Sequence, residues 1–271
     1  MKKIMHIIVG ALISSMLFST TMFAQELKVM SYNVKAFEGQ TNDPDLMFRL
    51  QPFADAIKRY NPDIICIQEL ETHTSRQGAR ELLTELGSLL GMYPLFGFSY
   101  VKDVGWYGNG ILSKYPIMNT FSNLLPYNSS RSYDQRSYVA ADILVPATGN
   151  AGGKIVRIVN THLDHRYNSP WYGQREEHAN RIVEDALDSA IPTILMGDMN
   201  EDPTGTNSKA IVAFSAACDR ICDNSGTFSS SKLDYIFGFP KNIWTVIDYT
   251  VDRTNNLSDH YPIIGTVKLG N

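Results

Sequence analysis

Short apolar runs that end in polar residues recur along the chain and predict β-strands. The run at 27–33 alternates between apolar and polar side chains, which is typical of a strand. The runs at 63–69 and 191–196 are almost continuously apolar and predict buried strands. Further strands are expected at 137–141, 159–163 and 232–237. The sequence therefore predicts several strands that carry polar groups at their ends.

Apolar residues spaced three and four positions apart predict helices between these strands. Such patterns run through 46–57 and 179–186. Another runs through 82–90, and Gly91 follows it as a helix stop signal. Helices and strands are interleaved, without an internal repeat or an interdomain linker. We therefore expect a single domain of the mixed α/β class.

Two segments place residues of catalytic type after an apolar run. Asp198 and Asn200 follow the run at 191–196, and residues two apart lie on the same side of an extended chain. Farther on, the carboxylate Asp259 lies directly beside the imidazole of His260. Metal-assisted attack of water on phosphorus requires an oxygen ligand for the cation, a group that deprotonates the water, and donors for the developing charge. These segments therefore favour phosphoester hydrolysis.

Other strand ends supply the remaining candidates. Glu69 ends an apolar run and is the best candidate for a metal ligand, and Asn33 ends the first strand. His162 and Asp234 lie at the ends of two more predicted strands. A lone Asp or Asn after a strand is usually a turn former. Taken together, however, these residues favour one shared site.

In their order and spacing, these segments resemble the endonuclease/exonuclease/phosphatase superfamily. Its members include abasic-site endonucleases, pancreatic-type deoxyribonucleases, bacterial sphingomyelinases and inositol-polyphosphate phosphatases. The resemblance covers the chain from about Glu26 to Leu269. It implies an α/β fold that is a four-layer sandwich, in which two packed mixed β-sheets are flanked by helices. The active site is then expected at one end of the sandwich.

The resemblance makes Glu69 the principal ligand of a Mg²⁺ ion, with Mn²⁺ as a substitute. Asn33 and Asp259 are implied to lie close to the ion and its water shell. Some nucleases of the superfamily carry an acid two residues after this asparagine, whereas this chain has Lys35. The departure removes a second metal contact and favours a single-metal site.

The resemblance also implies roles around the scissile phosphate. Asp198 and Asn200 would face the phosphate, and His162 would complete the phosphate clamp. His260 would be the catalytic histidine, which Asp234 orients and keeps charged. Whether Asp198 or the Asp234–His260 pair removes the proton of the water is left open by the sequence.

Two further residues are candidates for substrate binding. Asn109 lies between two glycines and matches a superfamily position near the substrate phosphates. The alternative for Asn109 is a plain hairpin turn, because Asn-Gly is a strong turn signal. Arg136 precedes the strand at 137–141, and its planar guanidinium suits a phosphate. The alternative for Arg136 is a surface salt bridge.

Charge and aromatic content bear on the substrate. The formal net charge of −4 provides no general basic surface for nucleic acid. Glu71 stands where pancreatic-type deoxyribonucleases have an arginine, and an acid there would repel a duplex. Aromatic residues of the expected loops suit a base, a sugar ring or a lipid surface: Tyr100, Trp106, Tyr107, Tyr127, Tyr133, Tyr167, Trp171 and Tyr172. A small or headgroup-like phosphoester is therefore expected, with an extracellular or periplasmic nuclease and a non-catalytic binding protein as alternatives.

The first residues have the pattern of a secretory signal peptide. Lys2 and Lys3 precede an apolar run at 4–18, and a segment of Thr, Met, Phe and Ala follows up to position 24. We therefore expect a signal peptide at 1–24 and a catalytic domain at 25–271. The mature protein is expected to be periplasmic or secreted, monomeric, and without a stable membrane anchor.

Overall fold

The computed structural model describes residues 26–40, 42–43, 47–128, 134–146, 152–166, 172–188, 190–205 and 208–270. The signal peptide expected at 1–24 lies outside these ranges and stays a prediction. Within the described ranges, no helix has the length and apolar character needed to span a bilayer.

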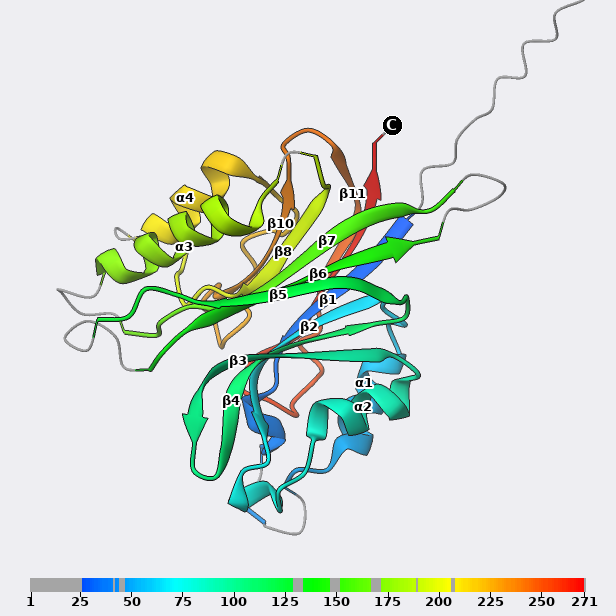
Figure 1. Cartoon of the computed structure of the whole chain (residues 1–271), viewed down its shortest axis with the longest axis vertical. Helices are drawn as coiled ribbons and strands as arrows, with labels where there is room; N and C mark the ends of the chain where they lie inside the picture. Colours follow the sequence, from blue (N-terminus) through cyan, green and yellow to red (C-terminus); the bar gives the residue numbers. More distant parts are fainter. Residues whose placement is uncertain are drawn as a thin grey trace, which may run out of the picture.

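Two six-stranded sheets pack face to face (Figure 1). The first has the order β11 (Trp244–Val251), β12 (Ile263–Leu269), β1 (Glu26–Asn33), β2 (Ile64–Thr72), β4 (Gly105–Ser113), β3 (Tyr93–Lys102). The second has the order β5 (Ile117–Leu124), β6 (Ser137–Val145), β7 (Lys154–His162), β8 (Thr193–Asp198), β10 (Asp234–Phe239), β9 (Asp219–Arg220). Both sheets are mixed, because β1 and β2 are parallel, as are β7 and β8, whereas the other pairs are antiparallel.

Helices cover the outer face of each sheet (Figure 1). α1 (Leu50–Lys58) and α2 (Leu82–Leu90) pack on the first sheet, and α3 (Tyr172–Ala186) and α4 (Lys209–Ala217) pack on the second. A 3₁₀ turn, η1 (Lys35–Phe37), follows β1, and another, η2 (Ser75–Gln77), follows β2. The predicted four-layer sandwich is confirmed.

Three of the helices match the predicted periodic segments. Gly91 ends α2 as expected, with a left-handed φ of 67°. The pattern at 46–57 gives a helix that begins later, at Leu50, and residues 44–46 lie outside the described ranges. The pattern at 179–186 is the second half of α3. The helix α4 was not predicted.

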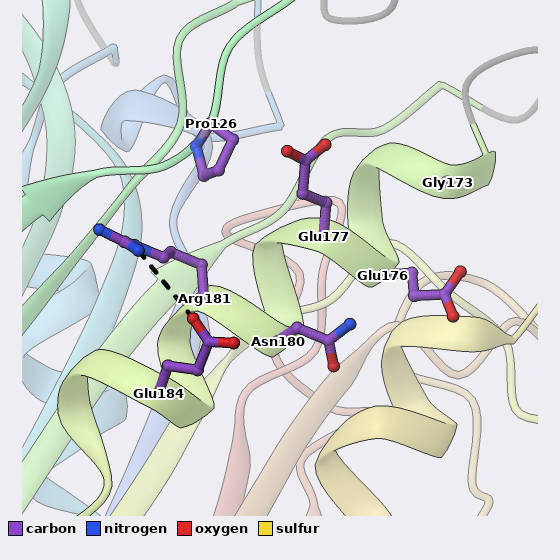
Figure 2. Close-up of a pocket in the computed structure, with 7 residues that line it drawn as sticks. All are labelled: Pro126, Gly173, Glu176, Glu177, Asn180, Arg181 and Glu184. Atoms are coloured by element: carbon purple, nitrogen blue, oxygen red, sulfur yellow. Dashed lines mark ion pairs between the residues drawn. The ribbon is translucent and has the colours of Figure 1, made fainter.

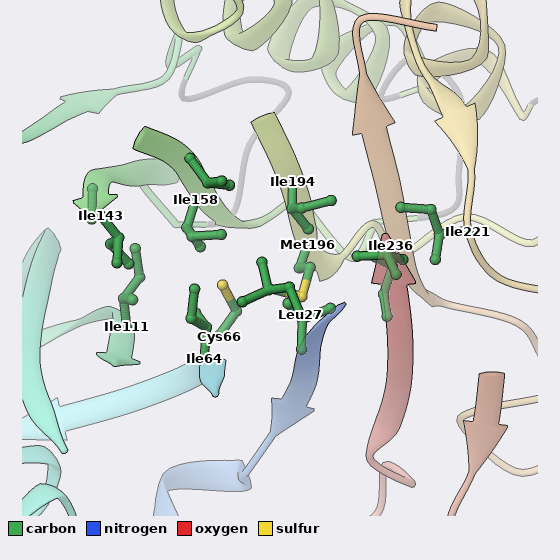
Figure 3. Close-up of a cluster of buried hydrophobic side chains, with 14 of the residues drawn as sticks. Leu27, Ile64, Cys66, Ile111, Ile143, Ile158, Ile194, Met196, Ile221 and Ile236 are labelled. Atoms are coloured by element: carbon green, nitrogen blue, oxygen red, sulfur yellow. The ribbon is translucent and has the colours of Figure 1, made fainter. Parts of the chain in front are cut away.

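The core consists of three apolar layers, one between the sheets and one under each pair of helices. On β1, Leu27 and Val29 face the opposite sheet, whereas Met30 and Tyr32 face the helices. Burial on both faces explains why the strands are apolar with little interruption. Figure 3 shows the inner layer, in which side chains of both sheets interdigitate: Leu27, Ile64, Cys66, Ile111, Ile143, Ile158, Ile194, Met196, Ile221 and Ile236. Each such side chain contributes about 1.5–3 kcal/mol when it is fully buried.

Candidate active site

Strand register brings three of the predicted catalytic residues side by side in the second sheet. His162 ends β7, Asp198 ends β8 and Asp234 begins β10. Asp198 is the register partner of both His162 and Asp234. These polar groups therefore share one edge of the sheet.

A close approach between strands fixes the position of Asp198. A Cβ atom on the preceding Gly197 would lie 2.0 Å from the carbonyl oxygen of Thr161, so only glycine fits there. Beyond the strand, the backbone N–H of Asn200 donates to Asp198 Oδ1 at 2.9 Å. Asn200 itself has a left-handed φ of 50°. The carboxylate is thereby held at the sheet edge through its Oδ1 atom, and its Oδ2 atom is left for other partners.

His260 lies between two buried carboxylates. Its Nδ1 donates to Asp234 Oδ2 at 2.9 Å, and its Nε2 lies 3.6 Å from Asp198 Oδ2. Burial disfavours the charged ring, but the carboxylates of Asp234 and Asp198 raise the pKa of His260 to about 10. Burial raises the pKa of Asp198 to about 7. His260 is therefore an imidazolium at neutral pH, with the carboxylate of Asp234 at one nitrogen and the carboxyl group of Asp198, whose pKa is about 7, near the other.

His162 lies on the other side of Asp198 and is neutral. Its Nε2 lies 2.9 Å from Asn200 Nδ2, and that amide also donates to the carbonyl of Leu163 at 3.0 Å. Because a carbonyl only accepts, the amide orientation is fixed, and His162 Nε2 must be an acceptor. Burial, together with the charges of Arg136 and His260, lowers the pKa of His162 well below its usual value. The proton is therefore on Nδ1, which is buried and has no partner among the described residues.

An asparagine joins the first sheet to this group. Asn33 Nδ2 donates to Glu69 Oε1 at 2.9 Å and to Asp198 Oδ2 at 3.0 Å. Asn33 Oδ1 accepts from the backbone N–H of Lys35 at 3.1 Å. Glu69 has a left-handed φ of 58° at an irregularity in the pairing of β2 with β4, which directs its side chain into the site. The amide of Asn33 thus connects the candidate metal ligand to the buried carboxylate of Asp198.

Asp259 is tied to the same place. The neighbouring Ser258 donates its hydroxyl to the carbonyl of Asn33 at 2.8 Å, which attaches the segment around 258–260 to the end of β1. The carboxylate of Asp259 forms an ion pair with Lys35 Nζ at 3.4 Å. Asp259 is about one-third exposed and is not part of the cleft lining, although its partner Lys35 is.

The donors present suit a divalent cation that prefers oxygen. Glu69 and Asp259 are partly exposed carboxylates, the first bonded to the amide of Asn33 and the second next to Ser258, which bonds the Asn33 carbonyl. Mg²⁺ is usually held by one or two carboxylates plus water. The ligand atoms of Asp198, Asp234 and His260 also lie within 4.8 Å of one another. However, a protonated imidazole has no lone pair for a metal, so this second group fits acid–base chemistry better. The ligand role of Asn33 stays a prediction, because its Nδ2 faces Glu69.

A cleft of about 420 Å³ opens over these residues. Four basic side chains and five carboxylates line it together with histidines, tyrosines and an asparagine: Lys35, Ala36, Glu38, Glu69, Glu71, Arg76, Tyr100, Lys102, Tyr107, Asp134, Arg136, His162, His165, Asp198, Asn200 and His260. Positive and negative groups are nearly balanced, so the cleft is not a broad basic groove.

The two candidate substrate-binding residues have different positions. Arg136 lines the cleft and is buried, with Nη2 at 3.2 Å from His165 Nδ1 and Nε without a partner among the described residues. The alternative of a surface salt bridge is therefore wrong for Arg136. Asn109 lies within β4 and outside the cleft lining, and its Nδ2 donates to the carbonyl of Ser137 at 3.3 Å. A plain hairpin turn is therefore wrong for Asn109, and its substrate contact stays a prediction.

The expectation that Glu71 repels a duplex is wrong. Its side chain is fully buried and forms ion pairs with Arg76 and Lys102. Burial acts against ionisation, but the hydrogen bonds and charges of these two partners lower the pKa of Glu71 below its usual value. Sequence reasoning did not assign Arg76 and Lys102 to the cleft. The spacing of Glu71 from Glu69 was a usable signal, because residues two apart face the same side of a strand.

Aromatic residues contribute to one wall. Tyr100 and Tyr107 line the cleft and stack with ring centroids 4.9 Å apart. Trp106 and Tyr127 are about half exposed and lie outside the lining. Tyr133, Tyr167 and Trp171 lie outside the described residues, and the side chain of Tyr172 is also not described.

A second cavity, of about 390 Å³, lies beside α3 (Figure 2). Glu176, Glu177 and Glu184 give it an acidic lining, and Arg181 is paired with Glu184 at 4.0 Å. Three glutamates would repel an anionic ester. The catalytic chemistry is therefore expected in the cleft over the ends of β7 and β8.

Comparisons with known proteins agree with this architecture. The model of the family described as "Endonuclease/Exonuclease/phosphatase family" matches residues 30–260. A protein of this description from Bacteroides thetaiotaomicron is 19% identical, with a TM-score of 0.71 over 92% of this chain and 99% of that chain. A mannosyl-6-phosphatase from Bacteroides thetaiotaomicron VPI-5482 is 21% identical, with a TM-score of 0.68 over 89% and 99%. The catalytic domain of human Nocturnin, solved with bound sulfate, is 19% identical, with a TM-score of 0.68 over 90% and 93%. No curated protein sequence matches the chain.

Proposed function

The chain belongs to the endonuclease/exonuclease/phosphatase family, and we propose that it hydrolyses a phosphoester with activated water and a divalent metal ion. Members of this family are hydrolases that act on phosphoester bonds, and they generally use a divalent metal. One observation carries the proposal for this chain. The amide of Asn33 joins Glu69 to Asp198 across the two sheets, at the point where His260 meets Asp198.

Asp198 is the general base in this proposal. His260 already carries both of its ring protons, held by Asp234 on one side, and it has no site for a further proton. Asp198 Oδ2 faces the cleft and accepts from Asn33, and it has room for the proton of a water molecule. The sequence left two choices for the base, and the geometry favours Asp198.

Charge that develops on the phosphorus group is met by donors on both sides of Asp198. His260 provides a charged N–H, and His162 provides a neutral N–H on Nδ1. Arg136 Nε is a further buried donor in the cleft lining. Donors aimed at developing charge in a partly dry site are usually the largest contribution to such catalysis. Asn200 orients His162 and, through its backbone N–H, Asp198.

Glu69 and Asp259 would hold Mg²⁺, or Mn²⁺ in its place. When bound, the ion supplies Lewis-acid charge to a phosphate oxygen. Two carboxylates are enough to bind the ion weakly, because Mg²⁺ keeps several water ligands. The metal ion is part of the proposal because the donors are hard oxygens and Glu69 lines the cleft.

A small or headgroup-like phosphoester is the proposed substrate. A cleft of about 420 Å³ has the size of a small-molecule site. Its balanced charges provide no continuous basic track for a nucleic-acid backbone. The stacked pair Tyr100 and Tyr107 suits a sugar or polyol ring next to the phosphate.

A panel of substrates tests the activity and its class. The full chain is assayed with Mg²⁺ or EDTA on bis-p-nitrophenyl phosphate, inositol phosphates, sugar phosphates, sphingomyelin, RNA and plasmid DNA. We expect Mg²⁺-dependent turnover of a small ester. The control variant His73→Gln should have the wild-type rate, because His73 pairs with exposed Glu81 away from the cleft. Salt-sensitive cleavage of plasmid alone would instead indicate a nuclease. Absence of turnover on every substrate would favour a binding protein on this scaffold.

We also propose that the mature protein is a periplasmic or secreted monomer. The two lysines at the start of 1–24, the apolar run that follows them and the segment that ends at Ala24 support export. N-terminal sequencing of protein recovered from its host would support cleavage if it began near Gln25, and an intact Met1 would oppose it. Light scattering on a sizing column would test the monomer, and the mass of a dimer would contradict it.

A further inference from the structure

Lys35 lines the cleft, but the chemistry proposed above uses only its neighbours. Its Nζ atom lies 3.4 Å from Asp259 Oδ2, and its side chain shares the cleft with Glu69 and Asp198. Asp259 is one of the two carboxylates that suit a divalent ion. A lysine and a metal ion would therefore share one carboxylate.

The backbone holds Lys35 in this place in an unfavourable conformation. Lys35, Ala36 and Phe37 have φ angles of 46°, 52° and 59°, in the left-handed region that disfavours residues other than glycine. Phe37 is fully buried and packs edge-on against Phe53. Gln77 Nε2 donates to the carbonyl of Ala36 at 3.0 Å. Core packing on one side and a hydrogen bond on the other therefore maintain the turn that places Lys35 in the cleft.

The same backbone feature marks two residues with roles in the site. Glu69 has a φ of 58° and Asn200 a φ of 50°. Non-glycine residues in this region persist where the surrounding structure enforces them. Lys35 shares this property with Glu69 and Asn200, and also with residues outside the cleft lining such as His73.

The other basic residues of the cleft have different partners. Arg76 and Lys102 both form ion pairs with the buried Glu71. Arg136 contacts His165 on the side of the second sheet. Among the described residues of the cleft, Lys35 is the cation paired with a candidate metal ligand.

The ion pair of Lys35 with Asp259 contributes to the charge balance around the candidate metal ligands. Four carboxylates meet around the end of β1 and β8, namely Glu69, Asp198, Asp234 and Asp259. The two cations His260 and Lys35 cancel half of that charge. Within this set of six groups, two negative charges remain when Asp198 is ionised, which is the charge that one divalent ion neutralises.

We propose that Lys35 is a substrate-binding residue that supplies the second positive charge of a single-metal site. Its ammonium binds a non-bridging oxygen of the phosphoryl group beside the ion and limits the affinity for that ion through Asp259. This inference rests on the proposed function. It predicts opposite effects of one substitution, since loss of the ammonium strengthens metal binding and weakens turnover.

Calorimetric titration of the full chain with Mn²⁺, alongside steady-state rates, tests the inference. We expect Lys35→Gln to bind Mn²⁺ on the order of fivefold to tenfold more tightly than the wild type, because a cation next to the ligand is removed. At saturating metal, its kcat/KM should fall by about tenfold or more, because a charge at the phosphate is lost. Lys35→Arg should retain both values, since it keeps the charge.

Lys114→Gln is the matched control. Lys114 forms a similar ion pair with Asp63, at 3.2 Å, outside the cleft. It should leave the Mn²⁺ affinity and the rate unchanged. Equal Mn²⁺ affinity in Lys35→Gln and wild type would overturn the role proposed for Lys35 but leave the proposed metal dependence in place. A wild-type chain that binds no Mn²⁺ would overturn the proposed metal dependence together with this inference.

Discussion

Asp198 lies between two histidines of the cleft. One of these imidazoles is neutral and the other is positively charged. On the β7 side, His162 Nε2 lies 3.5 Å from Asp198 Oδ2, and on the β10 side, His260 Nε2 lies 3.6 Å from the same oxygen. Burial disfavours the charged ring at both positions. Only His260 has a further carboxylate, Asp234, at its other nitrogen.

The difference between the two sides shows how one additional carboxylate sets the charge of a buried imidazole. Burial lowers the pKa of His162 well below its usual value, whereas the carboxylates of Asp234 and Asp198 overcome burial and raise the pKa of His260 to about 10. Two imidazoles at similar distances from Asp198 thus differ in charge. His162 turns an unprotonated Nε2 toward Asp198 and carries its proton on the buried Nδ1, whereas His260 turns a charged N–H toward Asp198.

Removal of the shared carboxylate should have the largest effect. Asp198→Asn keeps the size of the side chain but removes the base between the two histidines. We expect turnover at saturating Mg²⁺ to fall on the order of a hundredfold or more. Steady-state rates measure the loss, and circular dichroism verifies the fold. A rate close to wild type would remove Asp198 from the mechanism.

Asp234→Asn should make the β10 side resemble the β7 side. The asparagine oxygen can still accept from His260 Nδ1, so the ring keeps its orientation but loses the charge that stabilises the imidazolium. We expect turnover to fall by about tenfold to a hundredfold. An unchanged rate would show that the charge of His260 plays no part.

A change on the β7 side should cost less. His162→Gln removes a neutral donor, and the expected loss is about tenfold, which corresponds to one hydrogen bond of about 1.4 kcal/mol. Rates of this variant are compared with those of Asp234→Asn under the same conditions. A greater loss in His162→Gln would reverse the assignment of the two sides.

A third buried histidine, His178, lies away from the cleft, so it shows the effect of burial on a histidine pKa without any catalytic role. His178 donates to the carbonyl of Pro126, and burial lowers the pKa of His178 to about 4. Its usual pKa is about 6.5, so the unfolded chain binds the proton first as the pH falls. Stability linked to His178 is therefore present above pH 6.5 and is lost as the pH falls toward 4.

Urea unfolding at two pH values tests this linkage. Between pH 6.5 and pH 5, the wild type should lose about 1.6 kcal/mol of unfolding free energy through His178. Over the same pH interval, the unfolding free energy of His178→Gln should fall by that much less than the unfolding free energy of the wild type. This difference does not depend on the stability of the variant at pH 7. Parallel pH dependences in the two proteins would argue against a buried neutral His178.

Much of the fold and of the site was accessible from the sequence. The strand ends at Asn33, Glu69 and Asp198 were recognisable because a polar residue follows several apolar ones. The helix α2 was accessible because Gly91 ends a clear amphipathic pattern. The helix α4 was missed because the segment at 209–217 is apolar on most sides, which gives a weak period.

Residues positioned by distant contacts were not accessible. The charge of Glu71 looks exposed in sequence, but Arg76 and the more distant Lys102 neutralise it in the structure. Asn109 lies between glycines that suggest a turn, yet pairing with two neighbouring strands makes it part of β4. Which histidine is charged also depends on a partner 26 residues away, since Asp234 accepts from His260.

The hydrolysis of bis-p-nitrophenyl phosphate by wild type and His260→Gln, each with Mg²⁺ and with EDTA, tests the central claim most directly. The charged histidine and the metal ion are both required in this account. Wild type should turn over with Mg²⁺ and stop in EDTA, and His260→Gln should be slower on the order of a hundredfold with Mg²⁺. Equal wild-type rates with Mg²⁺ and EDTA, or equal rates of the two proteins, would contradict it.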